Sequence, residues 1–132
     1  MSALDPWVSE RPALFRAEQE LTQRFTNGRI ARDGQVIVFE EEVQVSGITF
    51  SYQIRYAADH PYSAPSVYLR WPELPKTAEV HRFRDGSLCL HGPEEWHPSH
   101  TAALWLRNRV VAWIAALLSF SRTGVWDMKA GR

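Results

Sequence analysis

The sequence predicts an α+β domain in which helices pack against an antiparallel sheet. Three observations support this: a helical apolar pattern near the start, alternating apolar residues around a tight turn in the middle, and a long apolar helix near the end. The chain has 132 residues, the usual size for one hydrophobic core. We therefore expect a single domain over residues 1–132.

Residues 12–25 predict the first helix. Pro12 suits a first helical turn, and Ser9 is a candidate cap for it. Apolar residues recur here at helical spacing and predict one buried face, made of Leu14, Ala17, Leu21 and Phe25.

Residues 35–45 and 48–57 predict an antiparallel hairpin. They flank a Ser-Gly turn signal at positions 46–47, and apolar alternation is clearest at Phe50, Tyr52, Ile54 and Tyr56. Residues 66–71 form a further apolar run after a Pro-bearing stretch and predict a third strand. The middle of the chain is therefore expected to be a meander.

Residues 72–98 show no convincing period but concentrate His, Cys, Trp and charged side chains. Long irregular segments in compact domains are usually functional, so the functional site is expected here. Residues 101–120 return to a helical pattern that is apolar nearly all round, as in a helix laid across a core, and Gly124 ends it. We interpret Trp105, Trp113 and Trp126 as core and edge packing.

The composition excludes several classes of protein. Hydrophobic residues make up 45% and charged residues 23%, as in a globular domain. Lys plus Arg and Asp plus Glu number 15 each, so no global positive field attracts nucleic acid or an anionic membrane. The acidic run at residues 40–42 alternates faces on a strand, and we interpret it as a solvated edge.

The sequence also indicates a reducing, cytoplasmic setting. The N-terminal residues lack a basic segment followed by an apolar run, and the most apolar stretch, residues 104–118, is interrupted by charges. We therefore expect neither export nor a membrane-spanning helix. The single cysteine, Cys89, cannot form an internal disulfide and is expected to be a free thiol.

Three motifs resemble the core of the ubiquitin-conjugating enzyme family. The family's Tyr-Pro-Phe-x-x-Pro segment is matched by HPYSAP at residues 60–65, and its Gly-x-x-Cys-Leu motif by GSLCL at residues 86–90. Its Trp-x-Pro element and the threonine after it are matched by residues 96–98 and Thr101. The motifs keep the family's order with similar spacing, and the resemblance extends over nearly the whole chain.

The resemblance implies a fold and a chemistry. The fold has an N-terminal helix, an antiparallel β-meander, a long active-site loop and a C-terminal helix packed on the sheet. Cys89 would accept a ubiquitin-like protein from an activating enzyme as a thioester and pass it to an amine on a target protein. A thiolate is a good nucleophile near neutral pH, and a thioester stays reactive toward amines. No metal or other cofactor is expected.

The chain departs from the family upstream of the cysteine. The family's His-Pro-Asn tripeptide reads His-Arg-Phe at residues 81–83. In the family that Asn is credited with stabilising the oxyanion formed when an amine attacks the thioester, so this role has no assigned residue here. The shortened form looks more like bacterial ubiquitin-conjugating-like proteins. Those lie beside activating enzymes, deconjugating peptidases or nucleotidyltransferases in antiphage operons, which implies antiviral defence.

Four histidines lie near Cys89 in the sequence. His81 matches the family's loop histidine and is interpreted as a member of the catalytic site that supports the loop, while His97 is a candidate base or hydrogen-bond donor. For each of these four histidines, His81, His91, His97 and His100, the alternative interpretation is a solvent-facing loop side chain. Cys and His are also zinc ligands, but their spacing here matches no recognised zinc pattern.

Activating enzymes in this chemistry usually dock the conjugating enzyme through its first helix. The resemblance therefore points to the polar face of residues 12–25, and the candidate docking residues are Arg16, Gln19, Glu20 and Gln23. A solvated helix face is the alternative interpretation for each of them.

Two other functions stay open at this point. The chain could be a non-catalytic module of the same fold that binds a ubiquitin-like protein or an activating enzyme; the missing Asn favours this, and the retained cysteine disfavours it. A cysteine peptidase using Cys89 and a histidine is the second alternative, although only the residue types suggest it. A lone cysteine can also be simply a small buried hydrophobe.

Overall fold

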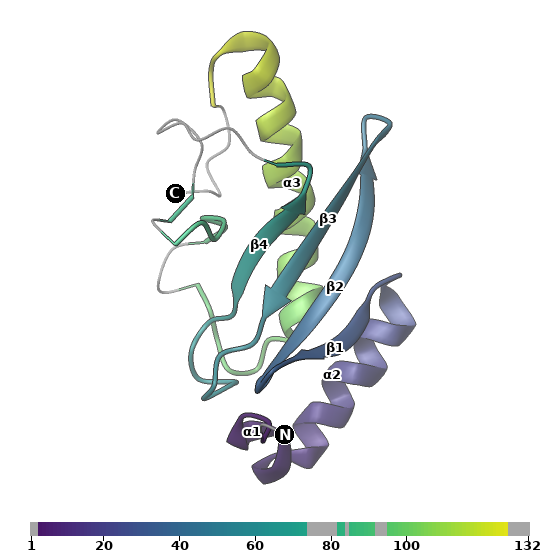
Figure 1. Ribbon diagram of the computed structural model, residues 1–132, viewed down its shortest axis with the longest axis vertical. Helices are drawn as coiled ribbons and strands as arrows, with labels where there is room; N and C mark the ends of the chain where they lie inside the picture. Colours follow the sequence, from purple (N-terminus) through teal and green to yellow (C-terminus); the bar gives the residue numbers. More distant parts are fainter. Residues whose placement is uncertain (1–2, 74–81, 84, 92–94, 127–132) are drawn as a thin grey trace.

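The α+β prediction is confirmed by the computed structural model, which describes residues 3–73, 82–83, 85–91 and 95–126. Its elements in chain order are α1 (Pro6–Glu10), α2 (Pro12–Phe25), β1 (Arg29–Asp33), β2 (Val36–Val45), β3 (Ile48–Arg55), β4 (Ser66–Trp71) and α3 (Ala102–Thr123). The strands of the described part form an antiparallel sheet in the order β1-β2-β3-β4. Helix α3 crosses one face of this sheet, and α2 lies beside its β1 edge (Figure 1).

Helix α2 has the predicted bounds, but its buried face differs from the prediction. The residues that it buries are Glu18 and Thr22, whereas Phe25 is 57% exposed. The reason is tertiary. Glu18 accepts hydrogen bonds from Tyr56, the residue after β3, and from Ala102 of α3, and these contacts turn its side of α2 toward the core. Ser9 is not the cap, because its hydroxyl donates to the Pro6 carbonyl within α1.

The predicted hairpin of β2 and β3 is confirmed. Val45 pairs with Ile48 across a turn in which Ser46 and Gly47 have positive φ angles of 53° and 80°. Two successive positive φ values suit the turns that join twisted antiparallel strands. The third predicted strand is also present, as β4, paired with β3.

Strand β1 was not predicted, and its presence changes the environment of the acidic run. It makes β2 an internal strand as far as Glu40, the last β2 residue that β1 pairs with. Glu41, one position further on, is buried with 4% exposure through contacts with β3 and α3. Its carboxylate accepts hydrogen bonds from Tyr52 Oη at 2.7 Å and from Arg107 Nε at 2.8 Å. The interpretation as a solvated edge was therefore wrong for Glu41, which links the sheet to α3.

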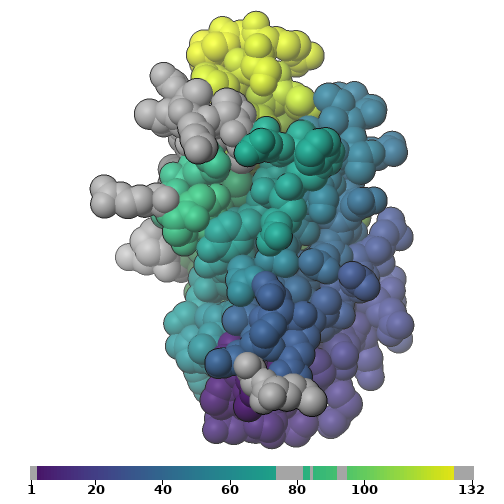
Figure 2. Space-filling view, in the orientation of Figure 1, coloured from purple at the N-terminus to yellow at the C-terminus, as the bar shows by residue number. Residues whose placement is uncertain are grey.

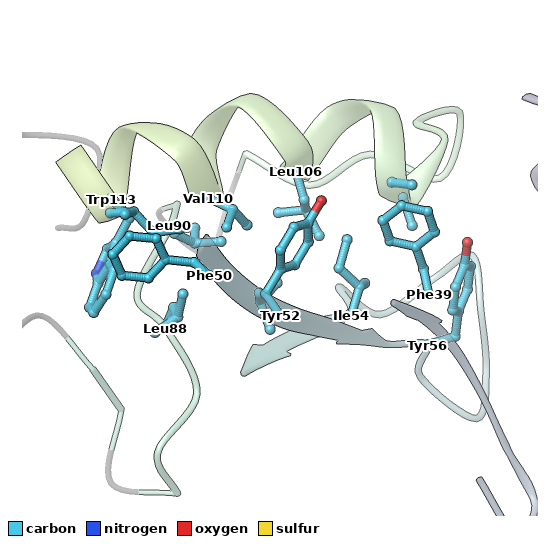
Figure 3. Close-up of a cluster of buried hydrophobic side chains, with 14 of the residues drawn as sticks. Phe39, Phe50, Tyr52, Ile54, Tyr56, Leu88, Leu90, Leu106, Val110 and Trp113 are labelled. Carbon is cyan, nitrogen blue, oxygen red and sulfur yellow. The ribbon is translucent and has the colours of Figure 1, made fainter. Parts of the chain in front are cut away.

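The core lies between the sheet and α3 (Figure 3). The inward-facing residues of β3 are fully buried, as the alternation predicted, and they meet Leu106, Val110 and Trp113 of the helix. Trp113 is the largest of the fully buried side chains, and Trp126 packs edge-on against it with ring centroids 5.3 Å apart. The interpretation of the C-terminal tryptophans as core and edge packing is confirmed.

Helix α3 is long and apolar enough, by length and composition alone, to cross a membrane. Its apolar residues have another partner in the structure, because Ala103, Leu106, Val110 and Ile114 are fully buried against the rest of the chain. Core packing accounts for this apolarity. The helix ends at Gly124, which has a left-handed φ of 75° and donates to the Phe120 carbonyl.

Candidate active site

The segment before Cys89 folds back on itself in a tight turn. The Phe83 amide donates to the Ser87 carbonyl at 2.8 Å, and the Gly86 amide donates to the Phe83 carbonyl at 2.9 Å. Gly86 has a φ of 92°, a left-handed conformation that disfavours any side chain. The glycine of the cysteine motif is therefore required by the turn that precedes the thiol.

Asp85 holds this turn from within. One of its carboxylate oxygens accepts both the Ser87 amide, at 2.9 Å, and the Ser87 hydroxyl, at 2.6 Å. The other oxygen accepts the Tyr68 hydroxyl at 3.4 Å. The hydrogen bonds from Ser87 lower the pKa of Asp85, so the ionised carboxylate is the form that stabilises the turn.

The cysteine segment is tied to the edge of the sheet. The Leu88 amide donates to the Val67 carbonyl of β4 at 2.7 Å. Leu88 and Leu90 are buried, with 4% and 1% exposure, and both enter the core at the Phe50 end (Figure 3). The surface of residues 85–91 accordingly adjoins that of β4 (Figure 2).

Cys89 lies between these two anchors. Unlike the two buried leucines beside it, Cys89 keeps part of its surface open to solvent. Cys89 is a free thiol of intermediate exposure. Burial raises the pKa of this thiol, so most of it is protonated at neutral pH.

Helix α3 supports the residues that follow the cysteine. The Arg109 guanidinium donates to the Leu90 carbonyl at 3.2 Å and to the Glu95 carboxylate at 3.4 Å, and it lies 4.4 Å from the centre of the Trp105 ring. The His91 ring packs on the same indole, with centroids 5.0 Å apart. Two helical side chains thus contact the two residues after Cys89.

Trp96 joins the loop before α3 to the turn at residues 60–65. Its indole Nε1 donates to the Pro61 carbonyl at 2.8 Å, and its ring meets Trp105 edge-on at 5.4 Å. The family motifs at these two positions are therefore in direct contact, which explains why an aromatic donor is found at position 96.

The histidines have distinct surroundings. The Ser99 amide donates to Nδ1 of His97 at 3.1 Å, so Nδ1 is an acceptor and neutral His97 carries its proton on Nε2. His100 stacks on Trp105 at 4.8 Å rather than facing solvent freely. His81, assigned to the catalytic site from its matched position, lies outside the described residues.

His60 occupies the first position of the turn motif and is fully buried. Its ring packs against Trp7 at 4.7 Å and Tyr56 at 4.8 Å. Neither ring nitrogen has a hydrogen-bond partner among the described residues. Burial lowers the pKa of His60 to about 4, so the ring is neutral near pH 7 and acts as an apolar core residue.

No group of three or more His, Cys, Asp and Glu side chains suited to a metal occurs within the described part of the chain. The polar face of α2 forms a different kind of feature, a shallow hollow of about 460 Å³ between α2 and β1. All four candidate docking residues line it: Arg16, Gln19, Glu20 and Gln23.

Several residues of this site were not identified from the sequence. Asp85 precedes Gly86, and an Asp-Gly pair is a turn signal that could have indicated its role. Arg109 and Trp105 lie at helical spacing, one turn apart on α3, but nothing in their own pattern shows that they contact the cysteine segment. These contacts depend on how α3 packs.

The comparisons with known proteins agree with the geometry. Residues 17–131 match the family model described as Type II CBASS E2 protein. No curated protein and no solved structure matches the chain.

Proposed function

The chain belongs to the type II CBASS E2 proteins, a bacterial antiphage ubiquitin-conjugating-like family, and we propose that it carries a ubiquitin-like protein as a thioester on Cys89. The observation that carries the proposal is the position of this thiol. It lies between two buried leucines on a segment tied to β4 and to α3, and Cys89 itself is only partly buried. A fixed backbone with a partly accessible thiol suits both steps, in which the sulfur first attacks a thioester and an amine then attacks the thioester formed on Cys89.

The first step is an exchange of thioesters. Sγ of Cys89 attacks the carbonyl carbon that joins the C-terminus of the ubiquitin-like protein to a cysteine of the activating enzyme. The old carbon–sulfur bond breaks, and the proton of Cys89 replaces the acyl group on the departing sulfur. In the second step an amine of the target attacks, loses a proton and releases the Cys89 thiolate.

Burial raises the pKa of Cys89, so the thiol carries a proton before it attacks and gives up this proton in the first step.

The oxyanion needs a hydrogen-bond donor. Among the described histidines, His97 is exposed, and its neutral form presents an Nε2–H to solvent. We assign His97 the role of hydrogen-bond donor to the oxyanion, the role that the family's missing Asn leaves vacant. His81 keeps its proposed role as a support of the loop.

The partners follow from the family. An activating enzyme would dock on the hollow beside α2, and the ubiquitin-like protein would lie over Cys89. The exposed side chains of that hollow include both charges, Arg16 and Glu20, which suits a polar, reversible interface. We place the reaction in the cytoplasm, where the thiol stays reduced.

The test is a charging assay with a candidate activating enzyme, its ubiquitin-like protein and ATP, followed by gels run with and without reductant. Wild-type protein should give an adduct that reductant removes. Cys89→Ser should give none, or an adduct that resists thiols because it is an oxygen ester. A matching activating enzyme that is itself charged but passes nothing to this protein would refute the proposal.

A second function has one observation in its favour. The raised pKa of Cys89 is what a structural cysteine shows, and it suits a module that binds a ubiquitin-like protein or activating enzyme without reacting. In that case Cys89→Ala would bind these partners as tightly as wild type, and no thioester would form in the charging assay.

A further inference from the structure

Glu18 of α2 is a buried carboxylate that joins three elements. The residue is 2% exposed, and its Oε1 accepts a hydrogen bond from the Tyr56 hydroxyl at 2.6 Å. The same oxygen accepts the backbone amide of Ala102 at 3.1 Å. Tyr56 directly follows β3, and Ala102 is the first residue of α3, so one oxygen atom connects α2, the sheet and the start of α3.

The start of α3 depends on this contact. Its N-cap residue, Thr101, makes no side-chain capping hydrogen bond, and the first turn contains no acidic residue. The first amides of a helix have no partner within the helix and carry partial positive charge. Glu18 supplies an acceptor to one of them, the Ala102 amide, although the two residues are 84 positions apart in the sequence.

The first turns of α3 in turn contact the cysteine segment. Trp105 packs against His91, and Arg109 donates to the Leu90 carbonyl. Both contacts lie within two positions of Cys89. A shift of the start of α3 would therefore be transmitted to the backbone that presents the thiol.

We propose that Glu18 is a positioning residue for Cys89: by capping α3 from within α2, it sets the position of the helix that supports the cysteine segment. The inference rests on the proposed function of Cys89 as the thioester carrier. Glu18 also lies on the helix whose outer face lines the hollow assigned to the activating enzyme, so docking and thiol presentation share one buried contact.

Two substitutions at Glu18 separate positioning from charge. Glu18→Gln keeps an oxygen at Oε1, so both hydrogen bonds remain while the acid is lost. Glu18→Leu removes both bonds and leaves the Ala102 amide and the Tyr56 hydroxyl unpaired. Rescue by Gln but not by Leu is the expected signature, because the hydrogen bonds, and not the ionisation, carry the role.

Two readouts are measured on protein shown to be folded by circular dichroism. The first is the single-turnover rate of transfer from saturating charged activating enzyme, which we expect to fall about tenfold in Glu18→Leu and to stay within about twofold in Glu18→Gln. The second is alkylation of the single thiol by iodoacetamide across pH. In Glu18→Leu it should be about threefold faster at pH 7, with the profile moved to lower pH, because a loosened segment desolvates the thiol less.

A pair of tyrosine variants gives the matched control. Tyr56→Phe removes the hydroxyl that donates to Glu18, and Tyr52→Phe removes a similarly buried hydroxyl that donates to Glu41. We expect about threefold slower transfer and a shifted alkylation profile only in Tyr56→Phe. If Glu18→Leu fails to fold, this pair decides the proposal.

The inference is overturned if the folded Glu18→Leu protein, or Tyr56→Phe in its place, keeps the wild-type alkylation profile. Alkylation needs neither cargo nor activating enzyme. If wild-type protein accepts no ubiquitin-like protein from a charged activating enzyme, the proposed function fails, while the alkylation profiles still decide whether Glu18 positions Cys89.

Discussion

Replacing Trp96 with Phe tests how the loop before α3 is held. The change keeps an aromatic ring but removes the Nε1–H that donates to the Pro61 carbonyl at 2.8 Å. Pro61 is buried, so its carbonyl would lose a partner with little access to water. A neutral hydrogen bond contributes about 1 kcal/mol and an unpaired buried acceptor adds to the loss, so we expect the free energy of unfolding to fall by about 1–2 kcal/mol. For a domain of this size that lowers Tm by about 5 °C.

The assay is urea unfolding followed by circular dichroism, combined with amide hydrogen exchange. The Tyr62 amide, which donates to the Asp59 carbonyl in the same turn, should exchange faster in Trp96→Phe. Trp105→Phe is the control, because it makes the same change of ring at a tryptophan with no hydrogen bond to a described residue, and it should leave that amide unchanged. A loss below about 0.3 kcal/mol in Trp96→Phe, with unaltered exchange at Tyr62, would refute the reasoning.

Three further predictions concern stability. Burial lowers the pKa of His60 to about 4, below the ordinary 6.5, so between these pH values the unfolded chain binds a proton that the folded chain does not. The free energy of unfolding should therefore fall by about 3 kcal/mol as pH drops through this window. Urea unfolding at several pH values should show this fall in the wild type and not in His60→Phe. Gly28→Ala places a Cβ 2.4 Å from a ring carbon of Phe39, so a loss of about 2–3 kcal/mol is expected, and a loss under about 0.5 kcal/mol would contradict it. Arg107→Met leaves the buried Glu41 carboxylate without its cation, so the free energy of unfolding, measured by thermal unfolding, should fall by about 2–3 kcal/mol. An unchanged free energy of unfolding would contradict this prediction.

The regular elements with strong local signals could be predicted from the sequence. Pro12 and the helical spacing after it gave the bounds of α2, and the Ser-Gly turn gave the β2–β3 hairpin, because these signals act between neighbouring residues. Strand β1 could not be predicted. Its five residues, RIARD, include three charged side chains, and only pairing with β2 makes them a strand.

The buried polar residues were beyond sequence reasoning for the same physical reason. Glu18 and Glu41 look like solvated acids in a helix and a strand. The partners of Glu18 lie 38 and 84 positions away, and Glu41 pairs with Tyr52, 11 positions away, and Arg107, 66 positions away. At the site, the cysteine motif identified Cys89, whereas the supporting contact from Arg109 to the Leu90 carbonyl exists only once α3 is packed. Local pattern thus identified the nucleophile, and tertiary packing identified what holds it.

The most direct test of the central claim is the intact mass of this protein after incubation with ATP, the activating enzyme and the ubiquitin-like protein. The chain has a single cysteine, so a thiol-sensitive adduct can form only at Cys89. We predict a gain equal to the mass of the ubiquitin-like protein less one water, which disappears with reductant and is absent in Cys89→Ala. No gain in the wild-type protein, or the same gain in Cys89→Ala, would contradict the assignment of Cys89 as the thioester carrier.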